Sequence, residues 1–289
     1  MRFDPGQLET LVAIVEEGSF DAAARRLRLT PSAVSQRIRA LERTAGSVLL
    51  RRASPVGVTE AGEPLLRLGR QLRLLTAEAV AVLDGTGGMA LPVAVNADSL
   101  ATWFRPVLAA AAARTPTALR LHVEDQAHSH ELLRSGAVVA AVTDAPEPVQ
   151  GCTVERLGEQ RYTAAAAPAL LAAHRRGGGI DWANLPMVVF NEKDRLQDQV
   201  LEACGVARPA VVHRVPTTAD FLAAIELGLG WGMLPDGQFE PSRRAGRVQA
   251  VPGAAALSVT LHWQRWRLPS EALAALTDDV RRAAARLQR

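Results

Sequence analysis

Three helix boundaries follow one another within the first 31 residues of this 289-residue sequence, and they restrict the fold more than any other feature. Apolar residues recur at helical spacing up to Gly18, whose missing side chain suits the left-handed residue that ends a helix. Ser19 is placed to cap a second helix over residues 21–27, and Thr30 followed by Pro31 is typical of the start of a third. We therefore expect three short helices around one small core.

The third of these helices has an apolar face and a polar face. At about 100° per residue, Val34, Ile38 and Leu41 lie together, whereas serine, glutamine and arginine side chains lie opposite them. A short helix, a tight turn and a helix of this kind are typical of a helix-turn-helix, whose polar face reads the major groove of DNA. Glutamine pairs there with adenine, and arginine with guanine or phosphate. An ordinary solvated helix face is the alternative interpretation.

A two-stranded wing is predicted after the third helix. Residues 47–50 form a short apolar strand and residues 58–59 return beside it, so the arginine pair at the turn would reach phosphate or the minor groove. The residues that we predict to contact DNA are Thr30, Pro31, Ser32, Ser35, Gln36, Arg37, Arg39, Arg51 and Arg52.

The distribution of charge supports this interpretation better than the total does. The net charge is only +3, and the abundance of arginine can reflect a GC-rich genome. Between residues 18 and 58, however, eight arginines stand against two acidic residues, a local net charge of +6. A segment that faces phosphate has this property.

A long helix is predicted over residues 60–84, capped by Thr59 and carrying a leucine-rich stripe. A helix of this length and pattern usually has a helical partner, so we expect it to form a homodimer. Pro64 interrupts its first turns. The run GTGG at residues 85–88 then breaks the chain, and we place a domain boundary there.

The rest of the chain alternates between strand and helix patterns. A first unit reads as a βαβαβ run, with strands at 91–95, 119–123 and 138–142 and helices at 99–113 and 129–134. A second unit follows, with strands near 162–166, 187–190, 210–215 and 231–234, helices near 194–204 and 217–229, and a surface loop at 175–179. A last strand at 257–263 and a helix at 270–287 return to the first unit. We therefore expect two α/β lobes joined by two crossovers.

The segments GSFDAAARRL, TPSAVSQRIRALE and VTEAG resemble the winged helix-turn-helix of LysR-type transcriptional regulators. In that family the long helix makes the dimer and joins the DNA reader to an effector-binding half. The segments LPVAVNADSLATWF, LHVEDQ, VVAAVT and LHWQRW are similar to the subgroup that senses lysine and arginine and controls basic amino acid export. The resemblance covers nearly the whole chain, departs from the pattern at Pro31 and Pro64, and gives little guidance between residues 150 and 215.

The carboxyl ends of the parallel strands are expected to converge on the ligand. Backbone N–H groups and the hydroxyl at Ser99, the expected cap of a helix, suit a ligand carboxylate. Asp98, Asp125 and Asp144 suit cationic groups, although each could instead be a simple cap or turn residue. Trp231 is expected in the core rather than at the ligand. The predicted effector-binding residues are Asn96, Asp98, Ser99, Asp125, Thr143, Asp144, Asn191, Thr217 and Thr218.

These predictions place the chain in the α/β class, with an N-terminal winged helix-turn-helix, a long linker helix and a two-lobed, periplasmic-binding-protein-like effector domain. The expected domains are residues 1–59 for DNA binding, 60–88 for the linker, dimerisation helix and hinge, and 89–289 for the effector. Lobe I is expected to comprise about 91–160 and 259–289, and lobe II about 161–258.

The sequence argues against several other classes of function. It has no GxSxG, no HExxH and no GxGxxG after a strand, so we expect no enzyme. The six histidines and two cysteines lack the spacing of metal ligands, and no metal or cofactor is expected. No apolar stretch approaches the roughly 18 residues of a membrane span, and the N-terminus does not resemble a secretory signal. We therefore expect a cytoplasmic protein without membrane contact.

The expected function is sequence-specific transcriptional regulation in response to lysine or arginine, with control of amino acid export or metabolism genes. The expected partners are double-stranded operator DNA, the effector, RNA polymerase and further copies of the chain in a homodimer or homotetramer. One alternative is a LysR-type regulator with a different small-molecule effector. A second is an α/β ligand-binding or catalytic protein with an accessory helical domain.

Overall fold

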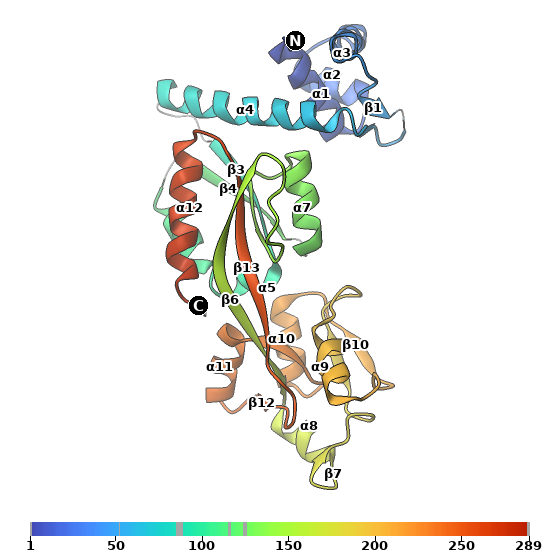
Figure 1. Ribbon diagram of the computed structural model, residues 1–289, viewed down its shortest axis with the longest axis vertical. Helices are drawn as coiled ribbons and strands as arrows, with labels where there is room; N and C mark the ends of the chain where they lie inside the picture. The colour runs from blue at the N-terminus through green and yellow to red at the C-terminus, as the bar shows by residue number, and fades with distance from the viewer. Residues whose placement is uncertain (1, 52, 85–88, 115–116, 124–125, 288–289) are drawn as a thin grey trace.

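The structure is a computed structural model that describes residues 2–51, 53–84, 89–114, 117–123 and 126–287. Figure 1 shows an elongated molecule with a helical head at one end, a long helix beneath it, and two α/β halves beyond that helix. Two long strands run through both halves. The described helices lack the combined length and hydropathy that a membrane-spanning segment requires.

The head consists of three helices whose boundaries follow the capping residues of the sequence. The side chains of Ser19 and Thr30 accept hydrogen bonds from the backbone N–H groups of Ala22 and Ala33, and Gly18 adopts a left-handed φ of 70°. Two short antiparallel strands form the wing. The elements are α1 (Pro5–Glu17), α2 (Phe20–Leu27), α3 (Pro31–Ala45), β1 (Leu50–Arg51) and β2 (Gly57–Val58).

Helix α4 (Glu63–Asp84) begins later than the sequence predicted, at residue 63 instead of 60. Thr59 caps a turn that precedes the helix, because its Oγ1 accepts from the Gly62 N–H at 3.1 Å. Pro64 then lies in the first turn, where a missing N–H breaks no hydrogen bond, so it does not interrupt the helix. Gly69 allows α4 to pack on α1, since a Cβ there would lie 2.8 Å from an α1 side chain.

Within the described residues, a seven-stranded sheet has the order β11-β6-β13-β5-β3-β4, and β12 also pairs with β6. β3 is parallel to both β4 and β5, as the βαβαβ pattern predicted. β13 pairs antiparallel with β6 along its whole length, and the two strands connect the two halves (Figure 1). The strands are β3 (Met89–Val95), β4 (Thr117–Val123), β5 (Ala140–Thr143), β6 (Cys152–Ala166), β11 (Gly232–Pro235), β12 (Gln249–Ala250) and β13 (Leu257–Trp266).

The first half packs around a core that includes the buried rings of Phe104, Trp263 and Trp266. The prediction of one helix over residues 99–113 is wrong, because the chain forms two helices here. Pro106 lies in the first turn of the second one, where its missing N–H is tolerated; inside a continuous helix it would remove a hydrogen bond. The helices of this half are α5 (Ala97–Ala101), α6 (Arg105–Ala112), α7 (Gln126–Ser135) and α12 (Glu271–Ala284).

The second half surrounds the far ends of β6 and β13, and Trp231 is fully buried in it, as expected. The predicted surface loop at 175–179 contains a small hairpin, and β6 begins at Cys152 instead of 162. The sequence predicted neither α8 nor α11. The remaining elements are α8 (Pro168–Ala173), β7 (Arg175–Arg176), β8 (Gly179–Ile180), β9 (Met187–Val189), α9 (Leu196–Cys204), β10 (Val212–Arg214), α10 (Thr218–Glu226) and α11 (Asp236–Arg244).

Candidate functional site

The outer face of α3 carries exposed polar side chains. Its core face is buried, whereas Ser32, Gln36, Arg39 and Arg43 are exposed and Ser35 is half-buried. Within the part of the chain that the structure describes, neither Arg39 nor Arg43 forms an ion pair. Their guanidinium groups are therefore available to phosphate or to base edges. Figure 1 shows α3 on the side of the head that faces away from the α/β halves.

The other α3 residues predicted to contact DNA have different surroundings. Thr30 and Pro31 are exposed at the start of the helix. Arg37 is half-buried and turns toward α1, with its Nη1 3.4 Å from Thr10 Oγ1 and 3.5 Å from the Gly6 carbonyl oxygen. Arg37 thus holds α3 against α1.

The wing presents a single described arginine. Arg51 is exposed on β1, and its Nε donates to the Val58 carbonyl oxygen at 3.1 Å. This bond fixes the stem of the side chain along the wing. Arg52, the second arginine predicted there, lies outside the described residues.

A second cluster of polar side chains lies where α5 meets β6, at the junction of the two α/β halves. We call it the Asp98 site, and it consists of Asn96, Asp98, Ser99, Gln160 and Tyr162. The Asn96 Oδ1 accepts from the Ser99 N–H at 2.7 Å, so Asn96 caps α5. The prediction that Ser99 caps this helix is therefore wrong, and its N–H is already bonded.

Buried amide groups line the Asp98 site. Gln160 and Asn96 are 4% and 7% exposed. The Ser99 Oγ lies 3.3 Å from Gln160 Oε1 and accepts from Trp103 Nε1 at 3.0 Å. Among the described residues, Asn96 Nδ2 and Gln160 Nε2 have no hydrogen-bond partner. Because an unpaired buried donor costs free energy, both amides are placed to donate to an acceptor that comes from outside.

Among the described residues, the carboxylate of Asp98 has a hydrogen-bond donor but no cationic partner. Tyr162 Oη donates to Asp98 Oδ2 at 3.0 Å. Burial raises the pKa of Asp98 to about 6, the Tyr162 hydrogen bond offsets part of the rise, and the charge of Asp194 adds to it. Burial also raises the pKa of Tyr162 well above its ordinary value, so the hydroxyl keeps its proton. None of the groups that shift the Asp98 pKa is cationic, and an external cation would pair with this carboxylate.

The predicted residues at the ends of the other parallel strands lie in different environments. Thr143 is fully buried, and its Oγ1 accepts from the Ala145 N–H at 3.1 Å. Asp144 is exposed. Asp125 lies outside the described residues. Of the three aspartates proposed from the sequence, the structure therefore brings Asp98 alone into a described buried polar cluster.

In the second half, the predicted residues stabilise turns and helix ends. The Asn191 Oδ1 accepts from the Asp194 N–H at 3.0 Å. Thr217 is exposed and caps α10 through its bond from the Asp220 N–H, and Thr218 is half-buried in the first turn. Helix α10 contacts α5, which carries Asp98. Thr217 and Thr218 therefore lie at the start of the second-half helix that approaches the Asp98 site.

Sequence reasoning missed Gln160, Tyr162 and Asp194. Gln160 and Tyr162 occupy alternate positions of β6 and so share one face of the strand. The sequence offers only a weak signal for this pair. Tyr162 is the single tyrosine of the chain, but the predicted strand begins at residue 162 and so leaves Gln160 outside it. Asp194 lies in the loop before α9, where its Oδ2 accepts from the Phe190 N–H at 3.0 Å. No sequence pattern places it beside Asp98.

Known proteins match both parts of the chain. The family described as bacterial regulatory helix-turn-helix protein, lysR family, matches residues 5–63, and the LysR substrate binding domain matches residues 87–285. The lysine export transcriptional regulatory protein LysG of Corynebacterium glutamicum is 45% identical over 283 residues, which is 96% of each chain. The HTH-type transcriptional regulator LysG of Mycobacterium tuberculosis strain H37Rv is 43% identical and covers 100% of this chain and 96% of its own.

Two solved structures show the same full-length architecture. Full-length LysG from Corynebacterium glutamicum with bound effector Arg has a TM-score of 0.86 and 44% identity, with 99% of this chain and 100% of that chain covered. ArgP from Mycobacterium tuberculosis has a TM-score of 0.90 and 43% identity, with 100% and 99% covered. The matched families are those of regulators, and the head, the long helix and the α/β part follow one another as they do in these relatives. The chain therefore belongs to the LysR family of bacterial DNA-binding transcriptional regulators.

Proposed function

We propose that this regulator binds operator DNA through α3 and the wing and responds to arginine or lysine bound at the Asp98 site, so as to control amino acid export or metabolism genes. The observation that carries the effector assignment is the Asp98 carboxylate, which accepts from Tyr162 and has no cationic partner among the described residues. The relatives support it, because one is named as a lysine export regulator and one solved structure holds arginine as its effector.

The two kinds of group at the Asp98 site match the two ends of a basic amino acid. The unpaired NH₂ groups of Asn96 and Gln160 would donate to its carboxylate. Asp98 would accept from an ammonium or guanidinium group through a charge-assisted hydrogen bond, and Asp194 adds a second negative charge nearby. In this assignment Asp98 pairs with the side-chain cation and not with the α-ammonium that every amino acid carries. An amino acid with a neutral or acidic side chain would therefore leave the Asp98 charge unpaired, so the site discriminates against both.

The location of the site suggests how effector binding reaches the DNA. Asp98 and α5 belong to the first half, whereas Asp194 and α10 belong to the second. A ligand held by both would stabilise one angle between the halves. It changes DNA binding only to the extent that it binds that arrangement more tightly than others.

Assembly through α4 is part of the same proposal. Val80, Val82 and Leu83 near the end of α4 are 44%, 78% and 83% exposed, an apolar surface that a second helix would bury. In a homodimer, two α3 helices would reach successive major grooves about 34 Å apart. Pairing of the α/β parts would extend the dimer to a homotetramer. Contact with RNA polymerase and a cytoplasmic location complete the proposed role.

Isothermal titration calorimetry of the full-length protein tests the effector. Arginine and lysine should each give saturable heat, whereas glutamate and alanine should give none. Absence of heat with both basic amino acids would contradict the effector assignment and would leave the DNA reader unaffected.

Footprinting on the DNA upstream of the protein's own gene tests the reader. Gln36→Ala should weaken operator binding by about tenfold and relax sequence preference, because a base-edge contact is lost. Ser35→Ala should act in the same direction. Gln249→Ala removes an exposed glutamine on β12 and serves as the matched control. Full operator affinity in both α3 variants would show that another surface reads the DNA.

A further inference from the structure

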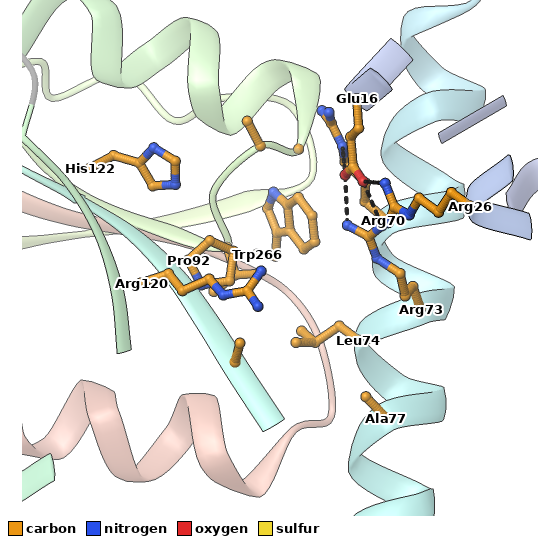
Figure 2. Close-up of a pocket in the computed structure, with 14 residues that line it drawn as sticks. Glu16, Arg26, Arg70, Arg73, Leu74, Ala77, Pro92, Arg120, His122 and Trp266 are labelled. Atoms are coloured by element: carbon orange, nitrogen blue, oxygen red, sulfur yellow. Dashed lines mark hydrogen bonds and ion pairs between the residues drawn. The ribbon is translucent and has the colours of Figure 1, made fainter. Parts of the chain in front are cut away.

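An open cavity of about 560 Å³ lies where α4 passes the first α/β half. Figure 2 shows α4 with its arginines on one side and the sheet with Arg120 and His122 on the other. The lining comes from α1, α2, α4, β3, β4 and β13, so all three functional parts of the chain contribute to it. Its size suits a small organic molecule.

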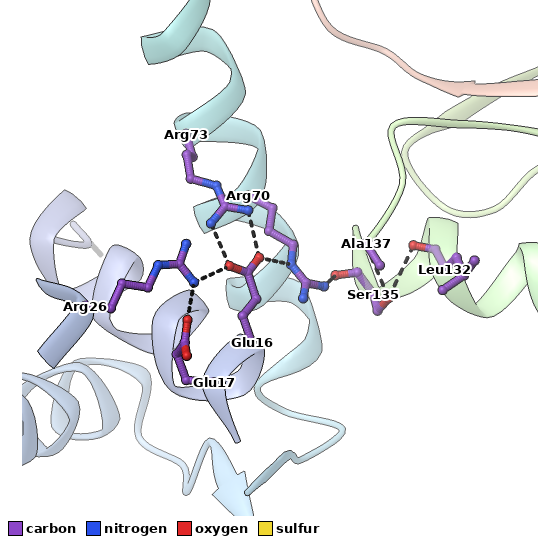
Figure 3. A network of polar contacts seen from close by, with 8 residues as sticks. All are labelled: Glu16, Glu17, Arg26, Arg70, Arg73, Leu132, Ser135 and Ala137. Carbon is purple, nitrogen blue, oxygen red and sulfur yellow. Dashed lines mark hydrogen bonds and ion pairs between the residues drawn. The ribbon is translucent and has the colours of Figure 1, made fainter. Parts of the chain in front are cut away.

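The helix side of this cavity is built on one carboxylate shared by three guanidinium groups. Glu16 lies 2.7 Å from Arg73 Nη2, 2.8 Å from Arg26 Nη1 and 3.6 Å from Arg70 Nε (Figure 3). Arg26 also reaches Glu17 at 3.2 Å. Even with both carboxylates counted, three arginines exceed them by one positive charge.

Arg70 connects this cluster to the α/β part. Its Nη1 donates to the Ser135 carbonyl oxygen at 2.7 Å, at the end of α7 (Figure 3). Its buried Nε has no hydrogen-bond partner among the described residues, although it faces Glu16 at 3.6 Å. Burial lowers the pKa of Arg70, and the charge of Glu16 offsets only part of that effect. Because Arg70 lines the cavity, its positive charge attracts an anion placed there.

The sheet side adds a fourth positive charge and an apolar wall. Arg120 is exposed on β4 and has no ion pair within the described part of the chain. Leu74 and Ala77 of α4, together with Pro92 and Trp266 of the sheet, supply apolar surface between the charged ends.

We propose that this cavity binds a small organic carboxylate, with its charged group at Arg120 and Arg70 and its apolar body against Leu74, Pro92 and Trp266. Guanidinium groups bind carboxylates through paired, charge-assisted hydrogen bonds. The ligand is opposite in charge to the one that suits Asp98, so the two sites take different molecules. Because the lining joins reader, linker helix and α/β part, the ligand stabilises the arrangement in which these parts are in contact.

The probe for this site is anilinonaphthalene sulfonate, an aromatic anion whose fluorescence rises in apolar surroundings. Full-length protein should bind one probe per chain at this site, and benzoate should displace it. Inorganic phosphate and free arginine should not, because the first lacks an apolar body and the second carries the wrong charge. Displacement of the probe by phosphate as effectively as by benzoate would overturn the proposal. Absence of probe binding would also overturn it, since a second copy of the chain would then cover the cavity.

Two variants and one control assign the probe to this cavity. Arg120→Ala should weaken probe binding by about tenfold or more, the effect expected from one lost hydrogen bond to a charged group. Ala77→Phe keeps every charge but places a larger side chain in the apolar part of the cavity, and it should weaken probe binding by a similar factor. Arg175→Ala removes an exposed arginine from the distant β7 hairpin and should change nothing. Circular dichroism verifies that each variant is folded. Unchanged probe affinity in both cavity variants would refute the site.

Discussion

Glu16 and Asp98 are two partly buried carboxylates with opposite surroundings. Burial alone would raise the pKa of Glu16, but hydrogen bonds from Arg73 and Arg26 lower it to about 2. Burial raises the pKa of Asp98 to about 6, and the hydrogen bond from the Tyr162 hydroxyl offsets only part of that rise. Within the described part of the chain, a carboxylate is thus paired with three arginines at Glu16 and with no cation at Asp98.

Under the proposed function, the difference separates a structural charge from a charge that is held for a ligand. Glu16 ties α1 to α2 and α4, and its favourable partners are all within the chain. Asp98 is held in position by Tyr162, and under the proposed function the effector supplies its counter-charge. A buried charge whose pKa is raised by desolvation is typical of functional sites. The contrast can be tested by removing each charge in turn.

The largest effect is expected from Asp98→Asn. Loss of a buried charge partner should weaken arginine binding by about 100-fold, whereas stability should not fall, because the substitution keeps a hydrogen-bond acceptor for Tyr162 and removes an unpaired charge. Calorimetry and urea denaturation measure the two properties. Glu202→Gln, at an exposed position on α9, is the control. Arginine affinity equal to that of the unmodified protein would show that Asp98 does not contact the effector.

For Glu16→Gln we expect the opposite of Asp98→Asn, a loss of stability without a loss of arginine affinity. The lowered pKa of Glu16 corresponds to roughly 3 kcal/mol, and solvent screening of this partly exposed group reduces the expected loss of unfolding free energy to about 2 kcal/mol at pH 7. Arginine affinity should remain unchanged. Urea denaturation is the measurement, and Glu9→Gln, an exposed position on the same helix, is the matched control. A similar loss of unfolding free energy in Glu16→Gln and Glu9→Gln would contradict the stabilising role that we assign to the ion pairs of Glu16.

The two carboxylates should also respond to pH in opposite ways. Asp98 has a raised pKa, about 6 against 3.8, so the folded chain keeps a proton that the unfolded chain releases, and this group favours folding as pH falls from 6 toward 4. Glu16 has a lowered pKa, about 2 against 4.5, so its contribution is present above pH 4.5 and is lost as pH falls toward 2.

Arginine binding provides the direct readout of the Asp98 titration. Protonation neutralises the carboxylate, so arginine affinity should fall by about tenfold per pH unit below 6. Calorimetry at pH 7 and pH 5 measures this, and Asp98→Asn should lose the dependence. An affinity that is the same at both pH values would contradict ionised Asp98 as the cation partner.

The smallest effect is expected from Gln160→Met, which keeps the size of the side chain but removes the unpaired NH₂ donor. Arginine affinity should fall by about fivefold, the range of one ordinary hydrogen bond. Leu222→Met, a half-buried position on α10 that makes no hydrogen bond through its side chain, is the control. A tighter complex in Gln160→Met would mean that the amide does not face the ligand.

The head was largely predictable because its signals are local. Ser19 and Thr30 cap helices through bonds to residues three positions away, and Gly18 ends one through its own left-handed conformation, as the sequence predicts. Arg37 differs, because its contact with α1 depends on the packing of two helices. The site residues at α5 and β6 depend on contacts between distant segments. Tyr162 meets Asp98 across 64 positions of sequence, and such pairs follow from sheet register and not from local pattern.

The paired strands β6 and β13 have a mechanical consequence. Because both continue from one half into the other, the halves are joined by a hydrogen-bonded ribbon, and changing the angle between them bends that ribbon elastically. The ladder is already irregular between Leu261 and His262, opposite Gly158, whose φ is 147°. Bending would concentrate there, since a bulge interrupts the regular pairing. An effector at Asp98 that changes the angle between the halves would then have to bend this ribbon. When the effector dissociates, elastic recovery of the ribbon would restore the original angle.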